Sequence, residues 1–435
     1  MDIFSPFWIA IFIFSITFVG ILSEKVHRSL IAFCWAVAMS IIGWMLGWYS
    51  SEQIQNSVDY PTLLLLWGMM VLVAVMEKTG VFEYLAIRIA KKTHGKYWKL
   101  LVALWIFTSI SSMILDNVTT IILVAPITLI ITRILHFNPI PLLMSQAVLS
   151  NIAGVATLVW DPPNIIIGSV AGFSFIEFLT HSLPVVLISW LIALGYILYS
   201  CQWENKVKPK YIEKLMEIKA HKSITKPIIL KKSLIVLTCV VLWFFFHHTL
   251  HLPASTIALL GAACILLLVA PHDNPQKYLK RIELSVFLFF TSLFVLVWWL
   301  EAAGVLDFIA TLIADGVQTN IVATAIALLW WAAILTAIID NIPMTIAMVP
   351  IIWFFESQWV PGTDILWWAL VFWVGFWANI SPIWSSANLV VMAKLELAGK
   401  KIHGSDWMAM WIPIAFLWLS VASAALMIFG NYFMR

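Results

Sequence analysis

Long apolar runs, separated by short polar segments, fill this chain from end to end. They predict membrane spans at residues 4–22, 30–49, 61–76, 142–175 and 183–201, and again at 233–250, 254–271, 284–300, 365–392 and 407–429. Five spans therefore fall in each half. Between the third and fourth spans of each half lies an extra apolar stretch, 98–135 and 320–356, which is too long for one upright helix. We interpret both stretches as re-entrant hairpins.

Composition indicates the same class of protein. Of 435 residues, 62% are hydrophobic and only 11% are charged, so the chain cannot present a soluble surface. We predict an all-α polytopic protein of the cell (inner) membrane with about ten transmembrane helices. Residues 1–22 have neither a basic segment nor a small-residue cleavage site, and they are predicted to be the first span and not a removable signal.

The sequence offers no sign of enzyme chemistry. It contains no nucleotide-binding loop, no nucleophile motif and no zinc-ligand spacing, and its four cysteines lie far apart. We therefore expect no metal site, no cofactor apart from H+ or Na+ as a coupling ion, and no nucleic-acid partner.

The positions of lysine and arginine predict the orientation. With the N-terminus outside, ten spans, and hairpins that enter and leave on one face, every Lys and Arg except Arg435 lies inside. Cytoplasmic loops are enriched in these residues. We therefore predict that both termini are outside and that the basic central linker is cytoplasmic.

Two parts of the chain repeat each other at a constant offset of 224 residues. Asp116-Asn117 recurs as Asp340-Asn341, and the same offset relates Pro126 to Pro350, Trp160 to Trp384 and Asn164 to Asn388. An odd number of spans per half turns the second copy upside down, so the duplication is predicted to be an inverted repeat. The expected parts are a first repeat at 1–202, a linker at 203–232 and a second repeat at 233–435.

Each repeat also contains a predicted break in a helix. Pro162-Pro163 interrupts the span at 142–175, and Pro382 interrupts the span at 365–392, because proline lacks an amide donor and clashes with the preceding turn. Non-helical backbone in a membrane persists only inside protein or beside a water-filled cavity. We expect the two hairpins and the two discontinuous helices to meet around one cavity near the midplane.

Three acids are expected in this cavity: Asp116, Asp161 and Asp340, with no Lys or Arg. Desolvation disfavours a charged carboxylate, so we predict that at least one of them carries a proton or binds a cation. The alternative is that they cap helix N-termini, and the two roles can coexist.

Neutral polar residues surround the same places. Candidate substrate-binding residues are Asn117, Asn341, Asn151, Asn164, Asn379, Asn388, Thr119, Thr120, Ser385 and Ser386. They can equally satisfy backbone groups freed at the breaks. Trp160 and Trp384 are candidate pocket walls. Packing is as good an explanation, since the chain has 25 tryptophans, most near span ends where an indole suits the membrane interface.

The motif segments resemble a known family. LDNVTTIILVAPITLI, SNIAGVATLVWDPPNIIIGSVAGFSF, IIDNIPMTIAMVPII and NISPIWSSANLVV are similar, in order, to the signature segments of the arsenite/antimonite permease and P-protein branch of the ion transporter superfamily. The resemblance implies a scaffold and a transport domain, an elevator-like movement and often a dimer, so a homodimer is a further expectation. Trp160 and Trp384 stand where the family pattern has glycine, and no cysteine lies in the motifs to bind As(III).

These observations lead to one hypothesis and two alternatives. The first is a secondary transporter of a small inorganic solute, a metalloid oxyacid or an anion, linked to the proton motive force. The second is a sodium/proton antiporter in which the same acids, with Asn151 and Asn379, bind sodium. The third is an uncoupled anion channel.

Overall fold

Helices are the only regular elements in the described part of the chain. The computed structural model describes residues 5–22, 26–48, 50–159, 161–200, 209–246, 249–250, 252–282, 284–335, 341–357, 360–382, 385–400 and 402–434. Within these residues, seven helices are long and apolar enough to cross a membrane, and six apolar helices are shorter. The predicted all-α polytopic class is confirmed.

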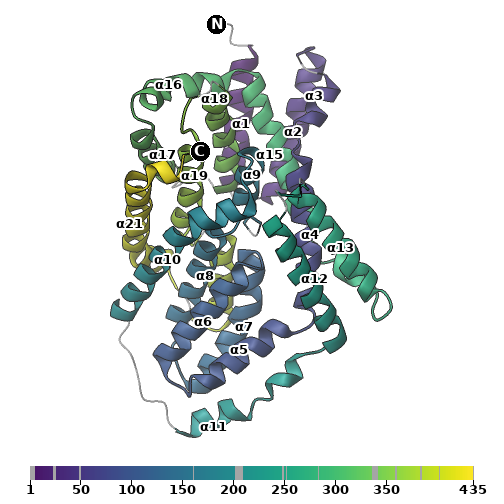
Figure 1. The fold of residues 1–435 in the computed structure, drawn as a ribbon, viewed down its shortest axis with the longest axis vertical. Helices are drawn as coiled ribbons and strands as arrows, with labels where there is room; N and C mark the ends of the chain where they lie inside the picture. Colours follow the sequence, from purple (N-terminus) through teal and green to yellow (C-terminus); the bar gives the residue numbers. More distant parts are fainter. Residues whose placement is uncertain are drawn as a thin grey trace.

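The first half contains ten helices in chain order (Figure 1): α1 (Pro6–Leu22), α2 (Arg28–Met45), α3 (Ser51–Asn56), α4 (Tyr60–Glu77), α5 (Val81–Lys92), α6 (Tyr97–Ser112), α7 (Asn117–Leu135), α8 (Pro139–Val155), α9 (Pro162–Val170) and α10 (Phe175–Ser200). The pair α6 and α7 is the first hairpin. The pair α8 and α9 is the first discontinuous helix.

The second half follows a short connecting region. That region holds α11 (Pro209–Glu217) and a 3₁₀ turn at Ala220–Ser223. The remaining helices are α12 (Pro227–Phe246), α13 (Ala254–Val269), α14 (Gln276–Leu279), α15 (Leu284–Ala302), α16 (Val305–Thr319), α17 (Ile321–Leu335), α18 (Asn341–Ser357), α19 (Asp364–Trp377), α20 (Ser386–Leu397) and α21 (Gly404–Ile428), with a last 3₁₀ turn at Gly430–Tyr432. Because α12 begins at Pro227, part of the predicted linker is helical, and the predicted repeat boundaries stay a prediction.

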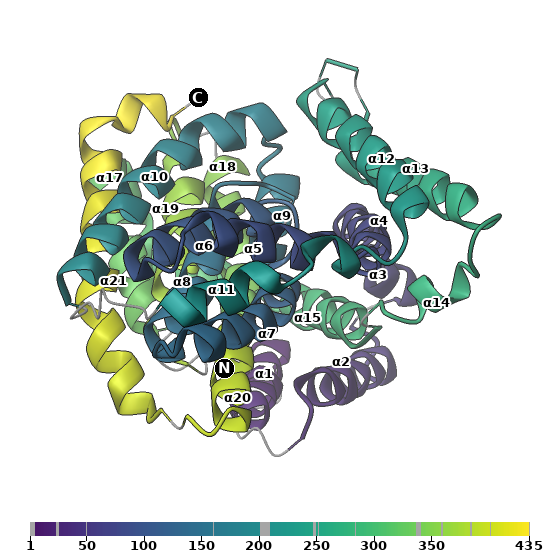
Figure 2. The ribbon, with the colours of Figure 1, turned by 90° about the horizontal axis from the view of Figure 1, so that it is seen from below.

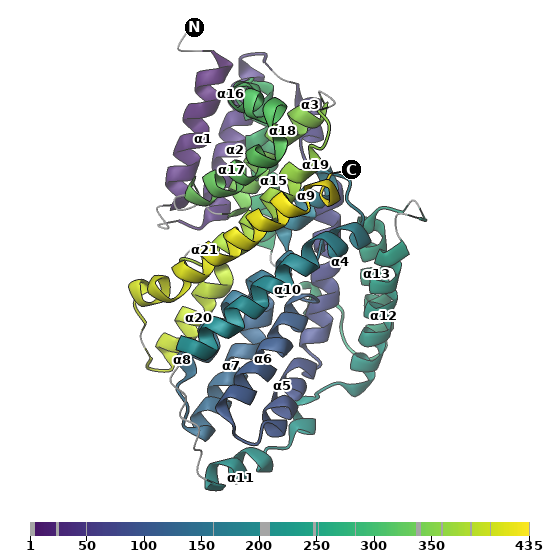
Figure 3. The same cartoon turned by 60° about the vertical axis from the view of Figure 1, so that its left-hand side comes forward.

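The sequence repeat is also a repeat of structure. Helices α4, α5, α6, α7 and α9 begin 224 residues before α15, α16, α17, α18 and α20. The contacts between helices repeat as well. Helix α13 packs on α4 of the first copy, and α2 packs on the equivalent helix, α15, of the second copy. Likewise, α20 packs on α7, and α9 packs on α18. In Figures 1 and 3, α5 to α7 lie towards one end of the molecule and α16 to α18 at the opposite end. The two copies are therefore inverted.

These contacts divide the helices into two sets. Helices α1, α2, α4, α12, α13 and α15 pack mainly on one another, and we call them the frame. The hairpins and discontinuous helices, α6 to α9 and α17 to α20, form the second set, which we call the core unit. Seen along the long axis, α2, α4, α12, α13 and α15 lie on one side, and α6, α8, α17 and α19 lie on the other (Figure 2).

Two asparagines close the helix breaks in the same way. The Asn164 side chain donates to the carbonyls of Gly154 and Thr157, at 3.0 Å each. The Asn388 side chain donates to the carbonyls of Ala378, at 3.2 Å, and Ser381, at 3.0 Å. Donors and acceptors all correspond at the repeat offset. Each amide thus pairs two carbonyls that the interrupted helix leaves without a partner.

Tryptophan is used in the interior more than we expected. At least eight indoles are fully buried in the protein: Trp105, Trp299, Trp367, Trp368, Trp373, Trp407, Trp411 and Trp418. The side chains of these residues pack inside the protein and do not face lipid. One of these indoles also pairs a polar backbone group: Trp407 Nε1 donates a hydrogen bond to the carbonyl of Asn379, beside the second break, at 3.0 Å.

Candidate functional site

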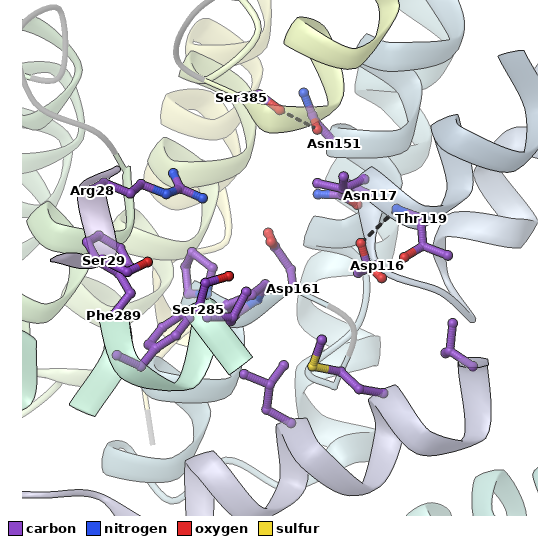
Figure 4. A pocket seen from close by; sticks show the side chains of 18 of the residues that line it. Arg28, Ser29, Asp116, Asn117, Thr119, Asn151, Asp161, Ser285, Phe289 and Ser385 are labelled. Atoms are coloured by element: carbon purple, nitrogen blue, oxygen red, sulfur yellow. Dashed lines mark hydrogen bonds between the residues drawn. The ribbon is translucent and has the colours of Figure 1, made fainter. Parts of the chain in front are cut away.

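A cavity of about 280 Å³ lies between the frame and the core unit. Frame helices α2, α4 and α15 line one side, and α7, α8, α9 and α19 line the other. Its polar lining consists of His27, Arg28, Ser29, Glu77, Asp116, Asn117, Thr119, Asn151, Asp161, Arg281, Ser285 and Ser385. In Figure 4, Asp161 lies between Arg28, Ser29 and Ser285 on one side and Asp116, Asn117 and Thr119 on the other.

Asp116 caps a helix and also lines the cavity. It is the N-cap of α7, and its carboxylate accepts a hydrogen bond from the Thr119 backbone N–H at 2.8 Å. An acid at a helix N-terminus also meets the positive end of the helix dipole. The same side chain lines the cavity (Figure 4), so capping fixes the carboxylate in place without removing it from the cavity.

Asp161 stands at the equivalent position of α9 but does not cap it. Its side chain makes no capping hydrogen bond, and the residue is only 8% exposed. Pro162 and Pro163, the first two residues of α9, have no N–H to donate, and the N–H of Asn164 at the third position makes no hydrogen bond to this carboxylate. The carboxylate of Asp161 is therefore directed into the cavity instead (Figure 4).

A cluster of amides joins the two repeats next to the cavity. Asn151 Nδ2 donates to Asn379 Oδ1 at 2.9 Å and lies 3.2 Å from Asn388 Oδ1. The Ser385 hydroxyl donates to Asn151 Oδ1 at 3.0 Å (Figure 4). Asn151 and Ser385 line the cavity, whereas Asn379 and Asn388 are fully buried outside the lining. The cluster holds the two discontinuous helices together.

The expectation that no Lys or Arg enters the cavity is wrong. Arg28 and Arg281 both line it. The guanidinium of Arg28 lies 5.2 Å from the centre of the Phe289 ring, and Arg281 forms an ion pair with Glu77 at 2.5 Å. From sequence, both arginines counted only as markers of the cytoplasmic side.

One signal for Arg28 was present in the sequence. Arg28 is the first residue of α2, whose first turn contains no acid. A cation at a helix N-terminus is opposed by the helix dipole, so arginine is a poor choice there on structural grounds. Such a residue suggests a role outside the helix.

Other candidates lie away from the cavity or cannot be placed. Thr120 and Asn164 are fully buried and do not line it. Among the described residues, Asn164 Oδ1, Thr120 Oγ1 and Thr157 Oγ1 have no hydrogen-bond partner. Residues outside the described part are Asp340, Trp160 and Trp384, and the side chains of Asn341 and Ser386 are also outside it.

Comparison with known proteins identifies the family. The model of the CitMHS family, described as "Citrate transporter", matches residues 18–373. The chain belongs to this family. It is therefore a membrane transporter, and the expectation that it is not an enzyme agrees with the names of its relatives.

Relatives of the CitMHS protein extend over its whole length. A "46 kDa membrane protein" of Mycobacterium leprae is 35% identical over 98% of both chains. An uncharacterised transporter of Mycobacterium tuberculosis is also 35% identical, again over 98% of both. The human P protein is 26% identical over 94% of this chain and 58% of its own length. The resemblance to the P-protein branch is thus confirmed.

A solved structure confirms the fold. The YdaH transporter of Alcanivorax borkumensis superposes with a TM-score of 0.60 and covers 88% of this chain and 89% of its own. The two sequences are only 11% identical, so the likeness concerns the fold alone.

Proposed function

We propose that this CitMHS protein is a proton-linked secondary transporter of a small anion. The observation that carries the proposal is the cavity itself, which brings the guanidinium of Arg28 on the frame close to the carboxylates of Asp116 and Asp161 on the core unit. An anion and a proton can then be handled side by side. Moving both together reduces the net charge that has to cross the low-dielectric membrane.

The arginines favour an anion over a neutral metalloid acid. A guanidinium is planar, is always charged, and matches a carboxylate with two parallel hydrogen bonds. Neutral arsenous acid needs no such partner. The description of the family as citrate transporters supports a carboxylate in particular. We therefore take a small di- or tricarboxylate as the first substrate class to test.

The acids are proposed to carry the coupling proton. Asp161 is the stronger candidate, because its carboxylate faces the cavity without a capping bond, whereas Asp116 is held by the Thr119 N–H. Protonation of an acid beside the bound anion removes a repulsion and so favours binding of the two together. Both acids lie on the core unit.

The division into frame and core unit supports an elevator-type movement. The cavity lies at the junction between the two sets of helices, with Arg28 on the frame and Asp116 and Asp161 on the core unit. In the predicted orientation, Arg28, Glu77 and Arg281 are at cytoplasmic ends, so this conformation corresponds to the inward-facing state.

Sodium is a second candidate for the coupling ion, with sodium/proton antiport as the alternative activity. The buried oxygens of Asn164, Thr157 and Thr120 without partners favour it, because amide and hydroxyl oxygens can ligate a cation. They lie on or beside the elements that form the first hairpin and the first break.

The test is a transport panel with the purified protein in liposomes. Citrate, succinate, arsenite, antimonite, silicate and chloride are offered under an imposed pH gradient or an imposed sodium gradient. The proposal predicts uptake of a carboxylate driven by the pH gradient. Uptake of arsenite but not of carboxylates contradicts the proposed substrate class. A solute flux that depends on neither the pH gradient nor the sodium gradient indicates a channel.

A further inference from the structure

A second cavity, of about 560 Å³, opens between α5, α6 and α12. It is lined almost entirely by apolar side chains, among them Phe82, Ile106, Ile110, Leu234 and Leu237. We call it the α5–α12 groove. It shares no lining residue with the cavity that contains Asp116 and Asp161.

The walls of the groove face outwards. Leu85 and Leu234 are 38% and 43% exposed, and Ile106 and Ile110 are 45% and 54% exposed. In a chain of this class, such exposed apolar side chains contact lipid and not water. The groove is therefore open to the hydrocarbon of the bilayer.

One end of the groove is basic. Lys92 is the last residue of α5, and Lys99 lies in the first turn of α6. Both side chains line the groove and both residues are exposed. Lys99 also lies 5.5 Å from the centre of the Trp98 ring. Of the described residues that line the groove, none is acidic.

We propose that the α5–α12 groove binds one anionic phospholipid. An acyl chain fills the apolar part, and the headgroup phosphate lies against Lys92 and Lys99. The occupant is inferred from this combination, since only a molecule with a long apolar part and a negative end matches both the walls and the mouth. The predicted orientation places both lysines on the cytoplasmic side, where anionic headgroups attract basic residues.

The position of the groove links this lipid to movement. Its lining combines α12 of the frame with α6 of the core unit and reaches Ile114, two residues before Asp116. A lipid seated there contacts both units beside the turn of the first hairpin. Its acyl chain, which reaches the Ile114 end of the groove, therefore influences how easily the hairpin moves against the frame.

Binding can be tested without reference to transport. The purified full-length protein is analysed by native mass spectrometry with phosphatidylglycerol or with phosphatidylcholine that carries the same acyl chains. We expect tighter retention of phosphatidylglycerol. Lys92→Gln and Lys99→Gln should each weaken it roughly fivefold, as expected for the loss of one basic residue near an anionic lipid.

Lys96→Gln is the matched control for the headgroup. Lys96 is exposed, lies between the two lysines in sequence and does not line the groove. Its variant should change retention by less than about twofold. Equal retention of the two lipids, or an equal loss in all three variants, overturns the proposal, because either result indicates a nonspecific basic surface.

A second pair of variants tests the acyl-chain part. Ala103 lines the groove, so Ala103→Trp fills it, and retention of phosphatidylglycerol should fall at least about tenfold. Ile130→Trp is the control, since Ile130 is 54% exposed on α7 of the same hairpin and outside the groove. Both variants are first checked for a single peak in size-exclusion chromatography. Unchanged retention by a well-folded Ala103→Trp protein overturns the proposal.

Discussion

At the residue scale, the cavity depends on where a few charged side chains are held. Sequence found Asp116 and Asp161, because acids in apolar segments are costly and stand out. It missed Arg28 and Arg281, because their position relative to the acids depends on packing between distant helices. Asp116 accepts a hydrogen bond from the Thr119 N–H, whereas Asp161 makes no capping bond; the two prolines explain only part of this difference, because Asn164 keeps its N–H.

Arg28 is predicted to recruit the anion. Arg28→Gln should raise the KM for citrate uptake at least about tenfold, because a charge-assisted hydrogen bond to a carboxylate is lost. Arg133→Gln is the control, as Arg133 is exposed at the end of α7 and outside the cavity. Rates of citrate uptake into proteoliposomes over a range of concentrations give both values. An unchanged KM in Arg28→Gln removes this residue from the site.

Asp116 allows capping and coupling to be separated. Asparagine caps a helix as well as aspartate does, so Asp116→Asn should keep its thermal stability in detergent but lose uptake driven by a pH gradient. Asp116→Ala should lose the uptake and, in addition, about 1 kcal/mol of stability. Gradient-driven uptake that survives in Asp116→Asn assigns Asp116 a capping role only.

At the element scale, the positions of the helix breaks and hairpins could be predicted from sequence. The side-chain hydrogen bonds that stabilise the breaks could not. Prolines indicated that both spans are interrupted, but α8 ends at Val155 and α19 at Trp377, several residues before Pro162 and Pro382. That Asn164 and Asn388 bind carbonyls of their own breaks requires the local backbone geometry, which the residue types alone do not specify. The sequence left substrate binding and backbone pairing open for both, and the structure shows them paired with backbone.

The two asparagines are predicted to stabilise the protein equally. Asn164→Leu and Asn388→Leu should each lower the free energy of unfolding by about 2–5 kcal/mol, because each leaves two buried carbonyls unpaired. Asn320→Ala, which removes an exposed N-cap bond to the Ala323 N–H, should cost about 1 kcal/mol. Thermal unfolding in detergent compares the three variants. If Asn164→Leu lowers the free energy of unfolding no more than Asn320→Ala does, Asn164 does not stabilise the helix break.

A polar cluster beyond the membrane ends of α12 and α13 is predicted to depend on pH. The Asp273 carboxylate accepts hydrogen bonds from Lys226, from Lys277 at 2.9 Å and from the Tyr278 hydroxyl at 2.9 Å. The hydrogen bond from Lys226 holds the pKa of Asp273 well below its ordinary value, and the same bond raises the pKa of Lys226.

The sign of the effect follows from these directions. A lowered pKa of Asp273 stabilises the fold above its unfolded value, about 4, and this stabilisation is lost as pH falls below it. The raised pKa of Lys226 stabilises the fold below about pH 10.4 and loses this effect as pH rises further. The difference in melting temperature between wild type and Asp273→Asn should therefore be largest near neutral pH and shrink towards both extremes. A difference that does not vary with pH contradicts the ion-pair account.

At the scale of the whole molecule, the inverted repeat was predicted because five is an odd number of spans and the motifs keep one offset. The helix starts confirm that offset across five pairs of elements. What sequence could not show is that the cavity lies where the frame meets the core unit. This arrangement places Arg28 on the frame and Asp116 and Asp161 on the core unit, and the proposed coupling of anion binding to movement rests on it.

The most direct test of this account measures protons during anion uptake. Proteoliposomes containing a pH-sensitive dye receive external citrate with the membrane potential clamped and no initial pH gradient. Wild type should acidify the lumen as citrate enters, whereas Asp161→Asn should exchange labelled citrate across the membrane without acidification. Citrate entry without proton entry in wild type, or unchanged acidification in Asp161→Asn, contradicts proton-linked transport through this cavity.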